Sequence, residues 1–171
     1  LLDVTQRLSN INDIFDVTTK PLVYDADTGG LSEHLVINTS SLQRIGGSAI
    51  IIEDKVGLKK NSLLGNDVLQ TQDTIEGFAS KINQVAKSKL NDDFMVIARI
   101  ESLILEAGIE DAINRAFAYV EAGADGIMIH SRKKTPDEIF NFSSLFRKKY
   151  TNIPLICVPT SYNTVYEKEL I

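Results

Sequence analysis

The feature that most constrains this 171-residue chain is a set of five short apolar runs that end in polar or charged residues. Apolar runs that do not alternate with polar residues are typical of strands covered on both faces of a parallel sheet. Because helical patterns separate the runs, the sequence predicts βαβ units and an α/β fold. The expected strands cover residues 22–27, 49–52, 94–101, 126–130 and 154–160.

The expected helices carry recognisable start signals. Ser32 is the predicted N-cap of one helix, and Asp73 opens a capping box with the glutamate three residues later. Thr135 precedes a proline suited to a first helical position, and Thr164 opens a capping box for one more helix. Besides the helix expected from Thr164, the expected helices cover residues 2–17, 32–45, 73–89, 110–122 and 135–150.

Five parallel strands leave two architectures open. An (β/α)8 TIM barrel usually needs roughly 200 residues or more, so the chain is either a barrel present in part or a complete open sheet. The only methionines are Met95 and Met128, and the sequence begins inside a helical pattern. We therefore expect residues 1–171 to be one partial barrel domain with about strands 3 to 7, whose N- and C-terminal parts are missing. We expect this segment alone to be unstable and inactive.

Composition excludes several classes of partner. A net charge of −5 without a basic patch argues against a nucleic-acid partner and against a polybasic membrane surface. No apolar run approaches the roughly 18 residues that a membrane helix needs. Cys157 is the single cysteine, which excludes an internal disulfide and fits a reducing, cytoplasmic compartment.

Carboxylates follow the first two expected strands. In parallel α/β folds the functional groups gather at the carboxyl ends of the strands. Asp25 and Asp27 lie two residues apart and would share one face of a strand. With Glu53 from the next strand they would form an oxygen-rich site suited to Mg²⁺, or to Mn²⁺. The alternative is a solvated strand end in which Asp25 caps the following turn.

Cationic and amide groups occupy the other strand ends and one loop. Lys59, Asn61 and Ser62 lie between two glycines, Gly57 and Gly65, that could act as hinges of a lid; the alternative is an ordinary lysine-rich surface loop. Arg99 interrupts an apolar strand and needs either a bound anion or a structural partner such as Glu101. His130, at a strand end, could bind an anion, although a single histidine is more often structural.

Four stretches together resemble the phosphoenolpyruvate mutase/isocitrate lyase superfamily, over nearly the whole chain. They are Asp25-Ala-Asp-Thr-Gly-Gly30, Glu53-Asp-Lys55 with Lys59-Lys-Asn-Ser62, Ala98-Arg-Ile-Glu101, and Ala122-Gly-Ala-Asp-Gly-Ile-Met-Ile-His130-Ser131. The resemblance implies a TIM barrel with a swapped last helix, assembled as a homodimer or homotetramer. It also implies a small 2-oxoacid as substrate.

The same resemblance implies roles for individual residues. Asp25, Asp27 and Glu53 would surround Mg²⁺, with Asp25 the most direct ligand and the others acting largely through water. Arg99 and His130 would hold a phosphoryl group, with Glu101 beside them. Lys59, Asn61 and Ser62 would belong to a loop that gates the site.

The reaction implied is the interconversion of phosphoenolpyruvate and phosphonopyruvate by the mutases of this superfamily, an entry step to phosphonates. The lyases resemble this chain less, because they carry a catalytic cysteine on the loop that here reads Lys55-Val-Gly-Leu-Lys-Lys-Asn61. Phosphonopyruvate hydrolases resemble it closely but tend to have threonine at the position of Asn61, which favours the mutase. The alternatives are that hydrolase, another lyase that cleaves a C–P or C–C bond, and a non-catalytic barrel that only binds a carboxylate ligand.

Overall fold

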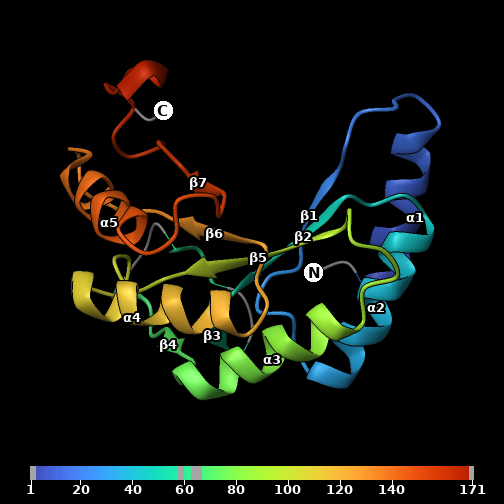
Figure 1. Ribbon diagram of the computed structural model, residues 1–171. Helices are drawn as coiled ribbons and strands as arrows, with labels where there is room; N and C mark the ends of the chain where they lie inside the picture. Colours follow the sequence, from blue (N-terminus) through green and yellow to red (C-terminus); the bar gives the residue numbers. More distant parts are fainter. Residues whose placement is uncertain (1–2, 58–59, 63–66, 170–171) are drawn as a thin grey trace.

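A parallel sheet forms the centre of the molecule (Figure 1). The computed structural model describes residues 3–57, 60–62 and 67–169. Five strands lie in the order β1-β2-β5-β6-β7, and every neighbouring pair is parallel. The predicted α/β fold is therefore confirmed. The strands are β1 (Val23–Asp25), β2 (Ala49–Glu53), β5 (Met95–Ile100), β6 (Gly126–Ile129) and β7 (Leu155–Cys157).

Helices connect these strands and cover one side of the sheet. In Figure 1, α2, α3 and α4 lie below the sheet, α1 stands at the right and α5 at the left. No helix in the described parts of the chain is long and apolar enough to cross a lipid bilayer. The helices are α1 (Val4–Phe15), α2 (Ser32–Arg44), α3 (Ile75–Lys87), α4 (Gly108–Glu121) and α5 (Asp137–Arg147).

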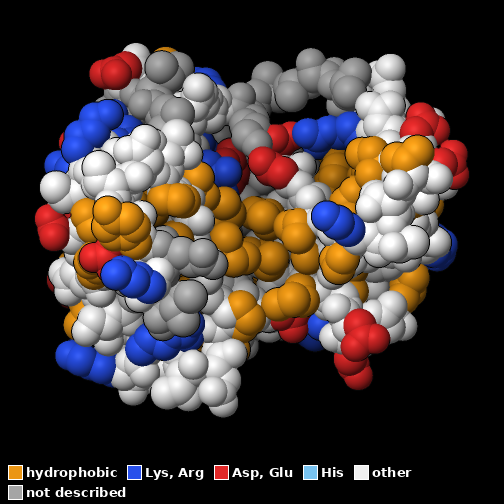
Figure 2. Space-filling model, turned by 90° about the horizontal axis from the view of Figure 1, so that it is seen from above, with side chains coloured by type: hydrophobic (Ala, Val, Ile, Leu, Met, Phe, Trp, Pro, Cys, Tyr) orange, Lys and Arg blue, Asp and Glu red, His pale blue; other side chains and the backbone are white. Residues whose placement is uncertain are grey.

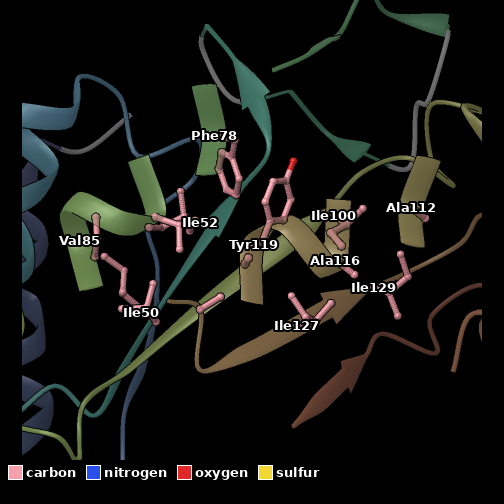
Figure 3. Close-up of a cluster of buried hydrophobic side chains, with 14 of the residues drawn as sticks. Ile50, Ile52, Phe78, Val85, Ile100, Ala112, Ala116, Tyr119, Ile127 and Ile129 are labelled. Atoms are coloured by element: carbon pink, nitrogen blue, oxygen red, sulfur yellow. The ribbon is translucent and has the colours of Figure 1, made fainter. Parts of the chain in front are cut away.

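The strand register sorts the side chains onto two faces. Residues paired across parallel strands point to the same face, and successive residues alternate between faces. Ile52, Ala98 and Ile127 are paired in this way, and all three are fully buried. They pack with Phe78 of α3 and Tyr119 of α4 in the core between sheet and helices (Figure 3). Each large side chain buried here contributes about 1.5–3 kcal/mol to folding.

The opposite face of the sheet is hollow. Glu53, Arg99 and Met128 form one row across it, one register position away from the core row. Figure 2 shows this side of the molecule as a depression with a largely hydrophobic floor between two raised flanks. Ile51 and Ile156 belong to the same face and are only half-buried. The helix-free face therefore combines charged strand ends with partly exposed apolar side chains.

A small hairpin was not expected from the sequence. Its strands, β3 (Lys55–Val56) and β4 (Thr71–Gln72), pair antiparallel after the end of β2. Strands of two residues are too short to produce a hydrophobic period. The hairpin brings the start and the end of segment 55–72 to the same corner of the sheet.

The structure corrects four helix starts. Leu31, not Ser32, is the N-cap of α2, since the first turn closes from Leu35 N–H to the Leu31 carbonyl. Thr74, not Asp73, caps α3, because its hydroxyl accepts the Gly77 N–H at 3.0 Å. Helix α5 begins after Pro136, and the Thr135 hydroxyl donates to Asp137 instead of capping the backbone. Instead of the helix expected from Thr164, the described chain forms a 3-10 turn at Glu167–Glu169.

Candidate active site

Four charged side chains meet on the hollow face at the carboxyl ends of β2 and β5. Glu53 and Arg99 are register partners on neighbouring strands. Lys55 lies two residues after Glu53, and Glu101 lies two residues after Arg99, so both return to the same face. Both carboxylates are almost completely buried, and Lys55 is only 3% exposed. A buried charge requires a partner. Lys55 Nζ lies 3.1 Å from Glu101 and 3.5 Å from Glu53, and Arg99 Nη2 lies 3.7 Å from Glu53.

Glu101 is the centre of this cluster. Its Oε1 accepts a hydrogen bond from Arg99 Nε at 2.7 Å and lies 2.7 Å from His130 Nε2. Its Oε2 accepts the hydroxyl proton of Ser62 at 2.6 Å. Three groups from three separate segments of the chain are therefore oriented by one carboxylate. Hydrogen bonds to an ionised group are about twice as strong as neutral ones.

Ser62 connects the loop after β3 to the strand ends. While its hydroxyl donates to Glu101, its oxygen accepts from Arg99 Nη2 at 2.9 Å and from Lys55 Nζ at 3.0 Å. Lys55 also donates to Gln70 Oε1 at 2.8 Å, near the other end of the loop. The structure thus brings Ser62, Arg99 and His130 together around Glu101.

The contacts define the protonation of the cluster. Burial by itself raises the pKa of Glu101, but the hydrogen bond and charge of His130, the charge of Arg99 and the Ser62 hydroxyl together lower this pKa well below its usual range. Glu101 is therefore ionised and can only accept. His130 Nε2 consequently carries a proton and donates it to Glu101. Arg99 Nη2 lies 3.3 Å from His130 Nε2. Both nitrogens are donors in this arrangement, so neither can accept a hydrogen bond from the other.

A cavity of about 460 Å³ opens directly above this cluster. Its volume suits a small ligand, since ligand pockets commonly measure about 300–1,000 Å³. Asn61 lies at its rim and is exposed, whereas Ser62 and His130 are buried in its wall. Lys59 and Gly65, which the sequence also placed on the loop, lie outside the described residues. The lining side chains are Lys60, Asn61, Ser62, Arg99, Met128, His130, Ser131, Val158, Thr160 and Ser161.

The aspartates after β1 differ from their expected geometry. Strand β1 ends at Asp25, and Asp27 adopts a left-handed backbone with φ 57°. The cause is the Asp25 side chain, whose Oδ1 accepts the Asp27 N–H at 2.9 Å and turns the chain out of the strand. The two carboxylates therefore do not extend from one regular strand. Asp27 instead forms an ion pair with Arg7 of α1 at 3.1 Å.

The carboxylates near the ends of β1 and β2 fit a divalent cation only if water completes its shell. Within the described residues, no three His, Cys, Asp or Glu side chains are grouped closely enough to form a complete protein cage for a metal. Mg²⁺, however, usually keeps several waters and needs only one or two direct carboxylates. Asp25 is exposed at the strand end, and the Glu53 N–H donates to the Asp27 carbonyl at 2.9 Å, which places β2 beside this turn. These oxygens fit an ion bound largely through water.

Sequence reasoning missed a second buried cluster, on the helix side of the same strand ends. Asp54, between Glu53 and Lys55, points to the opposite face and is 0% exposed. Burial raises its pKa to about 7, although Arg115 and three hydrogen bonds lower it. Arg115 lies on the buried side of α4, where a cation needs a partner, and this was the available signal. Lys55 was likewise missed as the partner of two carboxylates.

Fold and site together define a class of protein. A parallel α/β sheet, helix-covered on one face, carries Arg99, His130 and Ser62 beside a cavity at its carboxyl edge. This is the location of active sites in TIM-barrel proteins. A family model described as phosphoenolpyruvate phosphomutase matches residues 1–171.

Known relatives agree with this match. A phosphonopyruvate hydrolase of Variovorax sp. (strain Pal2) is 38% identical over 173 residues, which covers 99% of this chain and 58% of that protein. A phosphoenolpyruvate phosphomutase of Tetrahymena pyriformis is 38% identical over 163 residues, covering 94% of this chain and 53% of that protein. The chain thus spans little more than half the length of these relatives.

Solved structures show the same fold. The phosphoenolpyruvate phosphomutase of Streptomyces platensis subsp. rosaceus superposes with a TM-score of 0.89 at 32% identity, covering 99% of this chain and 58% of that one. A phosphonopyruvate hydrolase in complex with oxalate and Mg²⁺ superposes with a TM-score of 0.86 at 36% identity, covering 99% of this chain and 56% of that one. The chain belongs to the phosphoenolpyruvate phosphomutase family, and its sheet resembles the TIM-barrel-like fold of the phosphoenolpyruvate mutase/isocitrate lyase superfamily.

Proposed function

We propose that the complete protein is a phosphoenolpyruvate mutase, an Mg²⁺-dependent isomerase that interconverts phosphoenolpyruvate and phosphonopyruvate. The observation that carries this proposal is the group of donors at the base of the cavity. Arg99, His130 and Ser62 are all held by Glu101, within a volume of about 460 Å³ that suits a three-carbon acid with one phosphoryl group.

The residues of the cavity suit a phosphoryl group in transfer. Such a group passes through a loose, metaphosphate-like state whose charge lies on its equatorial oxygens. Catalysis then depends on fixed donors around those oxygens and needs no covalent step by the protein. Arg99 lines the cavity while its Nε binds Glu101 and its Nη2 binds Ser62, so its guanidinium is held at the cavity wall. Asn61 at the rim can add an amide donor.

Asp25 is the proposed direct ligand of Mg²⁺, and Asp27 and Glu53 act largely through water. The bound ion would stabilise the carboxylate and enolate oxygens of pyruvate while the phosphoryl group is detached. Glu53, held between Lys55 and Arg99, links this region to the phosphoryl donors. The ion pair of Arg7 with Asp27 offsets the charge of that carboxylate.

Phosphonopyruvate hydrolase is the second candidate, because a relative of that name matches 99% of this chain at 38% identity. The two activities share the site and differ in whether water reaches the phosphoryl group. Asn61 supports the mutase, as hydrolases resembling this chain tend to have threonine there. Another C–P or C–C lyase of the superfamily is a more distant candidate, and the loop from Lys55 to Asn61 lacks a cysteine.

We further propose that the chain contributes about strands 3 to 7 of one (β/α)8 barrel. The partly exposed apolar side chains of the hollow face support this, since the interior of such a barrel is packed with side chains. A homodimer or homotetramer is proposed from the family resemblance, and a cytoplasmic location from the single cysteine, which fits a reducing compartment.

Phosphorus NMR of the complete protein with phosphonopyruvate and Mg²⁺ tests the proposal. A growing phosphoenolpyruvate signal is the result expected of a mutase. Growth of inorganic phosphate would identify a hydrolase, and an unchanged phosphonate signal would refute both. Asn61→Thr is the matched variant: if Asn61 discriminates, this variant shifts the product toward phosphate, and an unaltered product ratio would remove Asn61 as a discriminator.

A further inference from the structure

A second polar cluster lies directly behind the candidate active site, on the helix-covered face of the sheet. At its centre is the carboxylate of Asp54, which accepts four hydrogen bonds. Oδ2 accepts from Gln72 Nε2 at 2.9 Å, from the Tyr119 hydroxyl at 2.9 Å and from Arg115 Nη1 at 3.3 Å. Oδ1 accepts the backbone N–H of Glu101 at 2.9 Å.

The bond to Glu101 has a particular position in the sheet. Strand β5 ends at Ile100, so the sheet ladder no longer fixes the backbone at Glu101. The Asp54 side chain fixes this backbone instead, by accepting the Glu101 N–H. The Asp54 N–H in turn donates to the Arg99 carbonyl at 3.0 Å. Without the Asp54 carboxylate, the N–H of a fully buried residue would lose its acceptor, which is unfavourable.

The same cluster holds the end of segment 55–72. The Asp54 carbonyl accepts the Asp73 N–H at 2.8 Å, and Arg115 Nη1 donates to the Asp73 carbonyl at 2.8 Å. Arg115 is itself held by Asp111, to which its Nε donates at 2.8 Å. The loop that carries Asn61 and Ser62 therefore returns to the sheet at Asp54.

The cluster is rigidly packed. Tyr119 stacks edge-on against Phe78, with ring centroids 4.7 Å apart, and both rings are fully buried (Figure 3). Its hydroxyl accepts from Arg115 Nη1 at 2.9 Å while it donates to Asp54. The position of the Asp54 carboxylate is thus determined by α3, α4 and β4 together.

We propose that Asp54, supported by Arg115, is a positioning residue: from behind the sheet it fixes the backbone of Glu101, and thereby the orientation in which Glu101 presents Arg99 and His130 to the substrate. The inference rests on the proposed function, because it assigns Asp54 a task in that reaction. Asp54 touches neither the cavity nor any reacting atom. Its effect passes through the 2.7 Å contacts of Glu101 with Arg99 and His130.

The chain contains a matched control at the opposite end of the same strand. Asp125 Oδ2 accepts the backbone N–H of Val96 in β5 at 2.8 Å and pairs with Lys89 at 3.1 Å. Like Asp54, it is a carboxylate that accepts a β5 N–H and binds one cation. It differs in lying at the amino end of the sheet, away from the cavity. Asp54→Ala and Asp125→Ala thus each remove the side-chain acceptor of a β5-end backbone N–H, at the two ends of one strand.

The experiment compares these two variants in the complete protein. Asp54→Ala is expected to lower kcat for phosphonopyruvate by about 100-fold, the cost of misplacing catalytic groups by about 1 Å, with a much smaller change in KM. It is also expected to shift the ¹⁵N resonance of His130 Nε2. Asp125→Ala is expected to lower the unfolding midpoint without changing kcat or the His130 resonance. Equal kcat values in the two variants, or an unmoved His130 resonance in Asp54→Ala, would overturn the proposal.

Two further results keep the inference separate from the proposed function. If the unmodified protein does not act on phosphonopyruvate, the proposed function falls, and the His130 resonance alone decides whether Asp54 positions the cluster. If Asp54→Ala does not fold, Tyr119→Phe replaces it, since it removes only one of the four bonds to Asp54. A smaller fall in kcat and a smaller shift of His130 are then expected, and no change in either would overturn the proposal.

Discussion

Replacement of Glu101 by glutamine is predicted to destabilise the protein in a pH-dependent manner. The carboxylate is fully buried and binds Arg99, His130 and Ser62 at 2.6–2.7 Å, with Lys55 at 3.1 Å. Glutamine has one acceptor oxygen, and its amide would face donors that need an acceptor. Removal of one partner of a buried ion pair costs about 3–5 kcal/mol. Because Glu53 stays near both cations, we expect about 3 kcal/mol at pH 7, the lower end of that range.

The pH dependence follows from the direction of the pKa shift. The pKa of Glu101 is lower in the folded protein than its ordinary value of 4.5. A carboxyl with a lowered folded pKa contributes its full stability above the unfolded pKa and loses it as the pH falls toward the folded pKa. The difference in unfolding free energy between the original protein and Glu101→Gln should therefore be constant near neutral pH and narrow below about pH 4.5.

Urea unfolding of the complete protein, followed by circular dichroism over a pH series, measures this difference. Glu121→Gln is the control, because it makes the same substitution in an exposed carboxylate that pairs with Lys149. This control should leave the unfolding midpoint unchanged. Equal stability of Glu101→Gln and the original protein at pH 7, or a difference that does not narrow in acid, would refute the reasoning.

Three further predictions concern the site and the chain. Arg99→Lys should lower kcat/KM for phosphonopyruvate by about 10²–10³, since lysine lacks the planar fork that binds Glu101 and substrate together; a loss below tenfold in a phosphorus NMR assay would contradict this. With Mg²⁺ present, oxalate at about 100 times its Kd should stabilise the complete protein by about 2.7 kcal/mol, seen as a higher melting temperature. Asp25→Asn should abolish this rise in melting temperature but leave the melting temperature without oxalate and Mg²⁺ unchanged. The isolated 171-residue chain should be inactive and melt without cooperativity, because half-buried apolar side chains such as Ile51 and Met128 remain uncovered; a cooperative melt with full activity would contradict this.

The fold was largely predictable because the apolar runs of the chain are strong local signals. Each predicted strand is present in the parallel sheet, and the helical periodicity identified α1 to α5. Helix starts were less predictable, since several residues near each start can cap it. At α3, Asp73 and Thr74 are both suitable, and only the folded backbone determines that Thr74 accepts the Gly77 N–H.

The site was predictable only in part, because its bonds join residues distant in sequence. The polar strand ends indicated Arg99, Glu101 and His130, and the structure brings these three together. The Asp25 side chain bends the backbone before Asp27, which a strand pattern cannot show. Asp54 meets Arg115 across 61 positions, so only the packing of α4 on the sheet reveals this pair.

The charge balance of the cluster has a consequence for how substrate and divalent cation affect each other's binding. Two acidic side chains, Glu53 and Glu101, face two basic ones, Lys55 and Arg99, so the formal charges of these four side chains cancel. A multiply charged anion entering the cavity would therefore gain little long-range attraction from them. On the proposed function, we expect the divalent cation to supply that attraction, so that each ligand raises the affinity for the other by the same factor.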